Sequence, residues 1–159
     1  MSNLTPRELE ILHEALDDEY RAWATYDQVL ADFGDVRPFV NIRESESRHI
    51  DAIRRLFELY DVPVPRNPWI GQVERYPSLQ AACEAGVAAE IANGEMYDRL
   101  IAGTQRAEIL SVLRNLQEAS QERHLPAFRR GAERSQGSGG RGGGGRGGGR
   151  RFRGGRRDA

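Results

Sequence analysis

The chain has no lysine, a single cysteine and no long apolar run, and each absence narrows what the protein can be. One thiol, that of Cys83, cannot build a disulfide framework within the chain or a Cys-x-x-Cys site for zinc or iron. Without a run of about 18 apolar residues, no segment is expected to cross a membrane, so membranes are not among the expected partners. The first residues also lack the basic and apolar regions of a secretory signal. Together these absences predict a cytoplasmic protein.

Every basic residue is therefore an arginine, and the arginines are distributed unevenly. Of the 23 arginines, 10 follow residue 128, where only Glu133 and Asp158 oppose them, so this segment carries a net charge of +8. The first 128 residues hold the other 13 arginines and 22 acidic residues, which leaves a net charge of −9. The shift in composition divides the chain into an acidic globular domain, residues 1–130, and a basic tail, residues 131–159.

The globular part contains four segments with the apolar spacing of amphipathic helices. These segments cover about residues 5–32, 35–60, 78–102 and 105–130. The first segment opens with Thr5 and Glu8, which can form a capping box. Four prolines between residues 61 and 77 predict an irregular crossover that reaches the opposite end of the helices. Two helical hairpins joined by one long crossover predict an all-α, ferritin-like four-helix bundle.

Two similar groups of polar residues interrupt the apolar faces of these helices. In each group a Glu is followed seven residues later by Tyr-Asp, and the next helix carries a polar residue three positions before a His. The first group contains Glu19, Tyr26, Glu46 and His49, and the second contains Glu90, Tyr97, Gln121 and His124. An ionised carboxylate in a helical core costs several kcal/mol unless it is paired or bound to a metal. The two groups therefore indicate a duplicated set of metal ligands.

The expected hairpins bring the two groups to one height in the bundle, because residues equally far from a turn lie at the same level. A Glu-x-x-His step places two ligands one turn apart on one helix face. Carboxylates that bridge two ions, with one histidine for each ion, favour a dinuclear iron or manganese centre. The predicted metal ligands are Glu19, Glu46, His49, Glu90, Gln121 and His124.

Tyr26 and Tyr97 each have two interpretations. Their hydroxyl groups could donate hydrogen bonds to metal ligands or take part in electron transfer. Alternatively, both rings pack in the core with a bonded hydroxyl. No residue is assigned a catalytic role on this basis.

With these residues, the chain resembles the ferritin-like di-iron carboxylate superfamily of ferritins, bacterioferritins, rubrerythrins and manganese catalases. More narrowly, it is similar to an uncharacterised prokaryotic ferritin-like domain, which shares Pro-Phe-x-Asn-Ile at residues 38–42 and His-Leu-x-Ala-Phe at residues 124–128. The resemblance covers about residues 5–130 and implies metal ligation by the five acidic and histidine residues named above. It also implies a function in redox chemistry or iron handling, of the kind that ferroxidases and peroxidases carry out.

Gln121 departs from the superfamily pattern, which places a second Glu-x-x-His step there. An amide coordinates a metal through its oxygen but contributes no charge. The second metal position would then be weaker, vacant or completed by water. Two functions stay open: a di-iron oxidoreductase of ferroxidase or peroxidase type, and a non-catalytic helical scaffold whose tail carries the function.

The basic tail consists mainly of arginine and glycine. Because such a segment cannot form an apolar core, we expect it to be disordered. It resembles the RGG-type tails of RNA-binding proteins, in which guanidinium groups contact phosphates and stack on bases. We therefore expect it to bind nucleic acid, RNA or DNA, or another polyanion. Two alternatives stay open: the tail binds the acidic bundle of a neighbouring molecule, as in a homodimer, or it only makes the chain more soluble and has no specific role. The arginines predicted to make these contacts are Arg141, Arg146, Arg150, Arg151, Arg153, Arg156 and Arg157.

Overall fold

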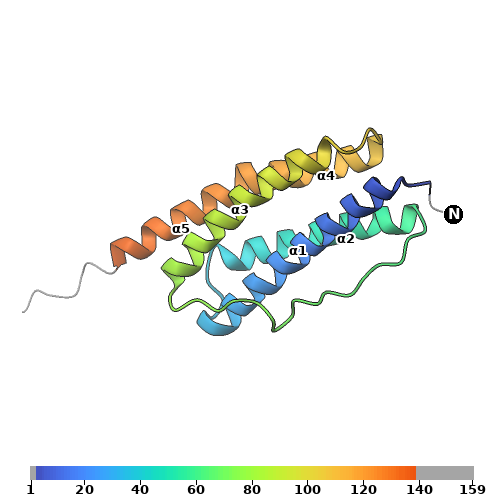
Figure 1. Ribbon diagram of the computed structural model, residues 1–159. Coiled ribbons are helices and arrows are strands. Elements are labelled where there is room, and N and C mark those ends of the chain that lie inside the picture. The colour runs from blue at the N-terminus through green and yellow to red at the C-terminus, as the bar shows by residue number, and fades with distance from the viewer. Residues whose placement is uncertain (1–2, 139–159) are drawn as a thin grey trace, which may run out of the picture.

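The computed structural model describes residues 3–138, which form an all-helical bundle (Figure 1). The elements are α1 (Pro6–Phe33), α2 (Phe39–Leu59), α3 (Leu79–Ile101), α4 (Ala107–Ala119), the π-helical turn η1 (Ser120–His124) and α5 (Leu125–Ser138). Because α4, η1 and α5 follow one another without a break, they make the fourth helix of the expected four. None of the described helices is both long and apolar enough to span a membrane. The tail arginines predicted to bind nucleic acid, Arg141 to Arg157, lie outside the described residues.

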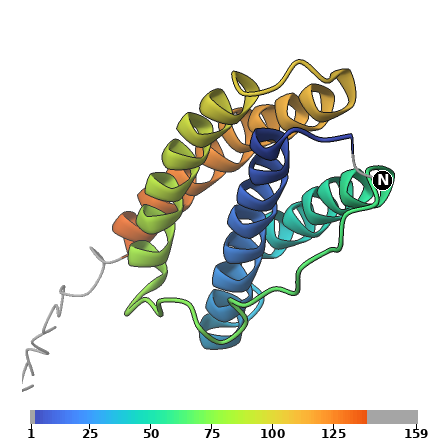
Figure 2. The same ribbon diagram turned by 45° about the vertical axis from the view of Figure 1, so that its right-hand side comes forward.

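The helices pair into two hairpins, α1 with α2 and α3 with the α4–α5 stretch (Figure 2). The hairpins meet with α1 beside α3 and α2 beside α4. The crossover between α2 and α3 runs along α1 (Figure 1). The Tyr20 hydroxyl donates to the carbonyl of Pro65 at 2.8 Å, and the Asn67 amide donates to the carbonyl of Tyr20 at 3.1 Å. These bonds attach the proline-rich crossover to α1, and the predicted ferritin-like bundle is confirmed.

Capping residues explain where α1 and α3 begin. The backbone N–H of Glu8 donates to the Thr5 hydroxyl at 3.1 Å, and the backbone N–H of Thr5 donates to the Glu8 carboxylate at 3.0 Å, so the capping box is confirmed. Ser78 caps α3 by accepting a backbone N–H bond. The Glu8 carboxylate also accepts bonds from Thr104 at 2.6 Å and Arg106 at 2.9 Å. These two bonds join the start of α1 to the turn between α3 and α4.

Two apolar clusters lie on either side of a buried polar layer in the middle of the bundle. The larger cluster includes Leu16, Phe57 and Leu100, and the smaller one includes Phe39 and Phe128. Burying a side chain of this size stabilises the fold by about 1.5–3 kcal/mol. The clusters therefore hold the bundle together at both ends and leave its middle to the polar residues.

The last helix is longer than the sequence pattern predicts. The helical end expected near residue 130 is wrong, because α5 continues to Ser138. A Cβ placed on Gly131 would lie 2.8 Å from the Cys83 sulfur and 3.2 Å from Pro38, so the helix here packs closely on the bundle. Ala132 adds an apolar contact to the smaller cluster. The composition predicts that residues 131–138 belong to the disordered tail, but they are helical, and the contacts of Gly131 and Ala132 pack the first part of this extension on the bundle.

Candidate metal centre

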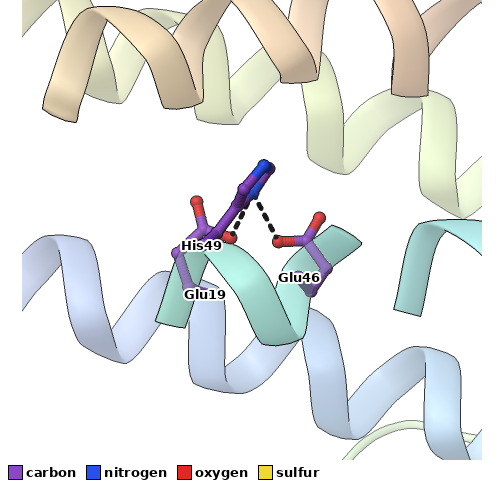
Figure 3. A group of neighbouring side chains, drawn as sticks. All are labelled: Glu19, Glu46 and His49. Carbon is purple, nitrogen blue, oxygen red and sulfur yellow. Dashed lines mark hydrogen bonds and ion pairs between the residues drawn. The ribbon is translucent and has the colours of Figure 1, made fainter. Parts of the chain in front are cut away.

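Glu19 on α1 and the Glu46-x-x-His49 step on α2 form one buried group (Figure 3). The Nδ1 atom of His49 lies 3.3 Å from one Glu46 oxygen and 3.5 Å from a Glu19 oxygen. Both carboxylates are only 2% exposed. Residues three apart share a helix face, which is why Glu46 and His49 point toward Glu19 together.

Glu46 also belongs to a second buried group, with Glu90 on α3 and His124 at the end of η1. The Nδ1 atom of His124 lies 3.2 Å from the other Glu46 oxygen and 3.4 Å from a Glu90 oxygen. In each group the potential ligand atoms lie within 4.8 Å of one another. Glu46 therefore occupies the centre of the site and directs one carboxylate oxygen to each histidine.

The two histidines are oriented by a shared serine. Their rings stack with centroids 5.4 Å apart, and the Ser45 hydroxyl lies 3.3 Å from Nε2 of His49 and 3.0 Å from Nε2 of His124. This contact leaves the Nδ1 atoms directed to the carboxylates. Within the described part of the chain, the buried Nδ1 of His124 has no hydrogen-bond partner. An unpaired imidazole nitrogen close to two carboxylates fits a metal ion, which would satisfy it.

The carboxylates and histidines also affect each other's pKa values. The pKa of Glu19 is raised to about 8, mainly because the carboxyl group is buried and secondly because the charge of Glu46 is close. Burial opposes the charged imidazoles, yet the neighbouring carboxylates of Glu19 and Glu46 raise the pKa of His49 to about 10. The carboxylates of Glu46 and Glu90, which lie close to His124, raise its pKa to about 9. Burial also opposes ionisation of Glu46, but its interactions with Glu19 and with the two nearby imidazoles lower its pKa. Metal binding would therefore release protons from this group.

Tyr26 and Tyr97 bond to the carboxylates across the bundle. Tyr97 on α3 donates its hydroxyl to Glu19 on α1 at 2.5 Å, and Tyr26 on α1 donates to Glu90 on α3 at 3.1 Å. Burial and the neighbouring carboxylate charges raise the pKa of both hydroxyls well above its usual value, so both remain donors. The rings pack in the apolar clusters and each hydroxyl bonds a carboxylate of the other hairpin, whereas a role of these hydroxyls toward metal ligands stays a prediction.

The π-helical turn decides which side chain meets Glu90. In a regular α-helix, Gln121 would share a face with His124. The wider π turn accommodates an extra residue, and it is Ser120 whose hydroxyl donates to the Glu90 carboxylate, at 2.5 Å. The Gln121 amide donates instead to the backbone carbonyl of Glu90 at 2.6 Å and to the Ser120 hydroxyl at 2.8 Å. Gln121 therefore bonds the backbone of Glu90 and not its carboxylate. Coordination of a metal by Gln121 stays a prediction.

Sequence reasoning missed several polar residues around the group. Besides the two serines, the Asn93 amide donates to the Asp18 carboxylate at 2.5 Å, next to Glu19. Burial, followed by the charge of Glu19, raises the pKa of Asp18 to about 7. Small polar residues inside helices have no distinctive spacing of their own. The signal that could have found Asn93 is its position three residues after Glu90, on the same helix face.

A cavity of about 200 Å³ opens between α1 and α3 and reaches the carboxylates. Glu46, Glu90 and Tyr26 lie along it, together with Asp18 and Asn93. Exposed residues such as Arg21 line it together with the buried carboxylates, so the cavity reaches from the surface toward the buried group.

The four-helix bundle therefore has a ferritin-like fold, and its middle holds buried groups of carboxylates and histidines. Residues 11–139 match a family described as an uncharacterized protein domain, DUF2202, and the chain belongs to this family.

Two solved structures have a similar fold. A hypothetical protein from Methanococcus jannaschii is 27% identical, with 86% of this chain and 85% of that chain covered and a TM-score of 0.75. The bacterioferritin BfrA of Mycobacterium tuberculosis is 21% identical, with 86% of this chain and 90% of that chain covered and a TM-score of 0.70. At this identity, the bacterioferritin shows the shared fold alone. No curated protein matches the chain.

Proposed function

We propose that the bundle holds two iron or manganese ions in a dinuclear carboxylate centre. Glu19, Glu46 and His49 would hold one ion, and Glu46, Glu90 and His124 the other. The observation that supports this arrangement best is the position of Glu46, which directs one oxygen to His49 and the other to His124. A carboxylate in this position is suited to bridge two ions.

The donor atoms agree with this choice of metals. Three carboxylates and two imidazoles surround the proposed positions, and neither group contains a cysteine. Oxygen-rich sites with imidazole suit iron or manganese, whereas thiolates favour softer ions. The three carboxylates would also offset most of the charge of two divalent ions. Bound ions would therefore stabilise carboxylates whose burial is otherwise unfavourable.

We further propose that the centre serves redox chemistry or iron handling, of ferroxidase or peroxide type. The bound iron or manganese ions would supply the redox chemistry by changing their oxidation state. The residues of the chain would hold the ligands in place: Tyr97 and Tyr26 orient Glu19 and Glu90, and Ser45 orients both histidines. The apolar clusters lie on both sides of the group along the bundle axis, and the cavity between α1 and α3 would offer an approach to the carboxylates.

Metal binding by a Glu46→Ala variant tests the proposal. Protein equilibrated with Mn²⁺, or with Fe²⁺ under nitrogen, and freed of excess metal should retain about two ions per chain when measured by elemental mass spectrometry. Glu46→Ala should retain less than about one ion, because both positions lose a shared ligand. Glu44→Ala, an exposed carboxylate on the same helix, should behave as wild type. Full retention by Glu46→Ala would refute the bridging role.

The tail carries a separate proposal, that its arginines bind nucleic acid or another polyanion. Because α5 extends to Ser138, a deletion that tests it should begin at residue 139. Removing residues 139–159 should abolish RNA and DNA binding at low salt and leave the metal content unchanged. Undiminished binding by the shortened chain would refute it.

A further inference from the structure

A second cavity, of about 580 Å³, lies on the opposite side of the buried group from the first. It opens between α2 and the stretch from α4 to α5, and we call it the α2–η1 pocket. Ser45 and the two histidines line its inner part. Its volume lies within the range of about 300–1,000 Å³ that is usual for pockets binding small organic molecules.

The α2–η1 pocket is basic although the domain is acidic. Arg48 on α2 and Arg123 on η1 both line it, one from each wall, and both are exposed. Among the described residues, neither arginine has a hydrogen-bond or ion-pair partner, and no acidic side chain lines the pocket. The cavity between α1 and α3 differs, because three acidic side chains, those of Asp18, Glu46 and Glu90, line it beside one arginine. A guanidinium group binds carboxylates and phosphates through paired hydrogen bonds, so this pocket favours an anion.

Apolar side chains form part of the pocket walls, beside Ser45 and the histidines. Ile42 and Leu116 are 4% and 3% exposed, and Ala52 and Ala127 line the pocket beside them. The exposed lining residues are the two arginines with two asparagines. A bare inorganic anion would leave the apolar walls uncovered, whereas a molecule with a charged head and an apolar body would contact both parts. Its apolar body would be favoured by about 25 cal/mol for each Å² removed from water.

We propose that the α2–η1 pocket binds an organic carboxylate with an apolar body. Its carboxylate lies between Arg48 and Arg123, and its body lies along Ile42 and Leu116 toward Ser45. The pocket is separate from the metal-facing atoms, since the histidines turn Nε2 toward Ser45 and Nδ1 toward the carboxylates. The inference therefore goes beyond the proposed metal centre and does not depend on it.

Calorimetric titration of the full-length protein with octanoate tests this proposal. Wild type should bind octanoate at one site per chain, and Arg48→Gln/Arg123→Gln should bind it at least about tenfold more weakly, because the charge-assisted hydrogen bonds are lost. Arg54→Gln/Arg114→Gln is the matched control: it removes two exposed arginines from α2 and α4 that do not line the pocket, and it should keep wild-type affinity. Acetate and octanol, which lack the apolar body or the charge, should each bind much more weakly.

The outcomes separate this inference from the metal centre. Absence of octanoate binding, equal loss in both double variants, or acetate or octanol binding as tightly as octanoate would each overturn it. Arg48→Gln/Arg123→Gln should keep the far-UV circular dichroism and the metal content of wild type, which would show that the loss is confined to the pocket. Octanoate binding by a wild-type protein that takes up no metal would support the pocket while refuting the metal centre.

Discussion

Replacing Tyr97 by phenylalanine should weaken the binding of the ion near Glu19 and His49 while the fold stays intact. The change removes a 2.5 Å hydrogen bond that orients the Glu19 carboxylate. Loss of a hydrogen bond to a metal ligand typically lowers metal affinity by about 10- to 100-fold, which corresponds to about 1.4–2.8 kcal/mol. Tyr26→Phe removes a longer bond, of 3.1 Å, to Glu90. Its effect should be smaller, because the Ser120 hydroxyl still donates to Glu90 at 2.5 Å.

Competition with a fluorescent Mn²⁺ chelator measures these affinities. Each variant should still bind about two ions, with one of them weakened and the larger loss in Tyr97→Phe. Tyr20→Phe makes the same chemical change at a hydroxyl that bonds the crossover carbonyl of Pro65 at 2.8 Å, away from the group, and should keep wild-type affinity. Unchanged affinity in Tyr97→Phe, or an equal loss in Tyr20→Phe, would refute the orienting role and leave only packing for these rings.

Two further substitutions test charge and packing outside the metal group. Burial opposes ionisation of Glu8, but hydrogen bonds from Thr104, from the helix N-cap and from Arg106 lower its pKa to about 2 from 4.5. The ionised form therefore stabilises the fold above pH 4.5, and this contribution is lost as the pH falls toward 2. Glu8→Gln should lower the free energy of unfolding by about 2 kcal/mol at neutral pH. In urea denaturation this difference should shrink as the pH falls, and a pH-independent difference would contradict the assignment. Gly86→Ala would place a Cβ 2.7 Å from the buried Phe128 ring. The strain should exceed the gain in helix propensity of about 1 kcal/mol, giving a net loss of about 1–2 kcal/mol and a lower Tm; a higher Tm would show that the ring can move aside.

The fold could be predicted because several local signals agreed. The capping box at Thr5 and Glu8, the apolar spacing and the run of prolines each specify one feature, and together they leave one arrangement of two hairpins. The polar residues of the core were also visible, since Glu46 and His49 interrupt an apolar face. Burial of such residues needs a partner, and the structure supplies it across the bundle.

The π-helical turn was missed in reading the sequence. Residues 120–124 contain no proline or glycine, but Pro126 follows two residues later and has no N–H to donate to the carbonyl of residue 122, which could have indicated an irregular helix. Contacts with α3 accompany the turn, since Ser120 bonds the Glu90 carboxylate and Gln121 bonds the backbone of the same residue. These contacts depend on how two helices far apart in the sequence pack, so Ser120 and not Gln121 bonds the Glu90 carboxylate. The extension of α5 to Ser138 has the same origin, because Gly131 packs on Cys83 of α3.

Anomalous scattering from crystals grown with Mn²⁺ or Fe²⁺ would test the dinuclear centre most directly. The account predicts two peaks on either side of the Glu46 carboxylate, one beside Nδ1 of His49 and one beside Nδ1 of His124. Peak heights near those of full occupancy would also show that the centre holds both ions although Gln121 stands where the superfamily pattern has a glutamate. A single peak, or no peak between these side chains, would contradict the central claim.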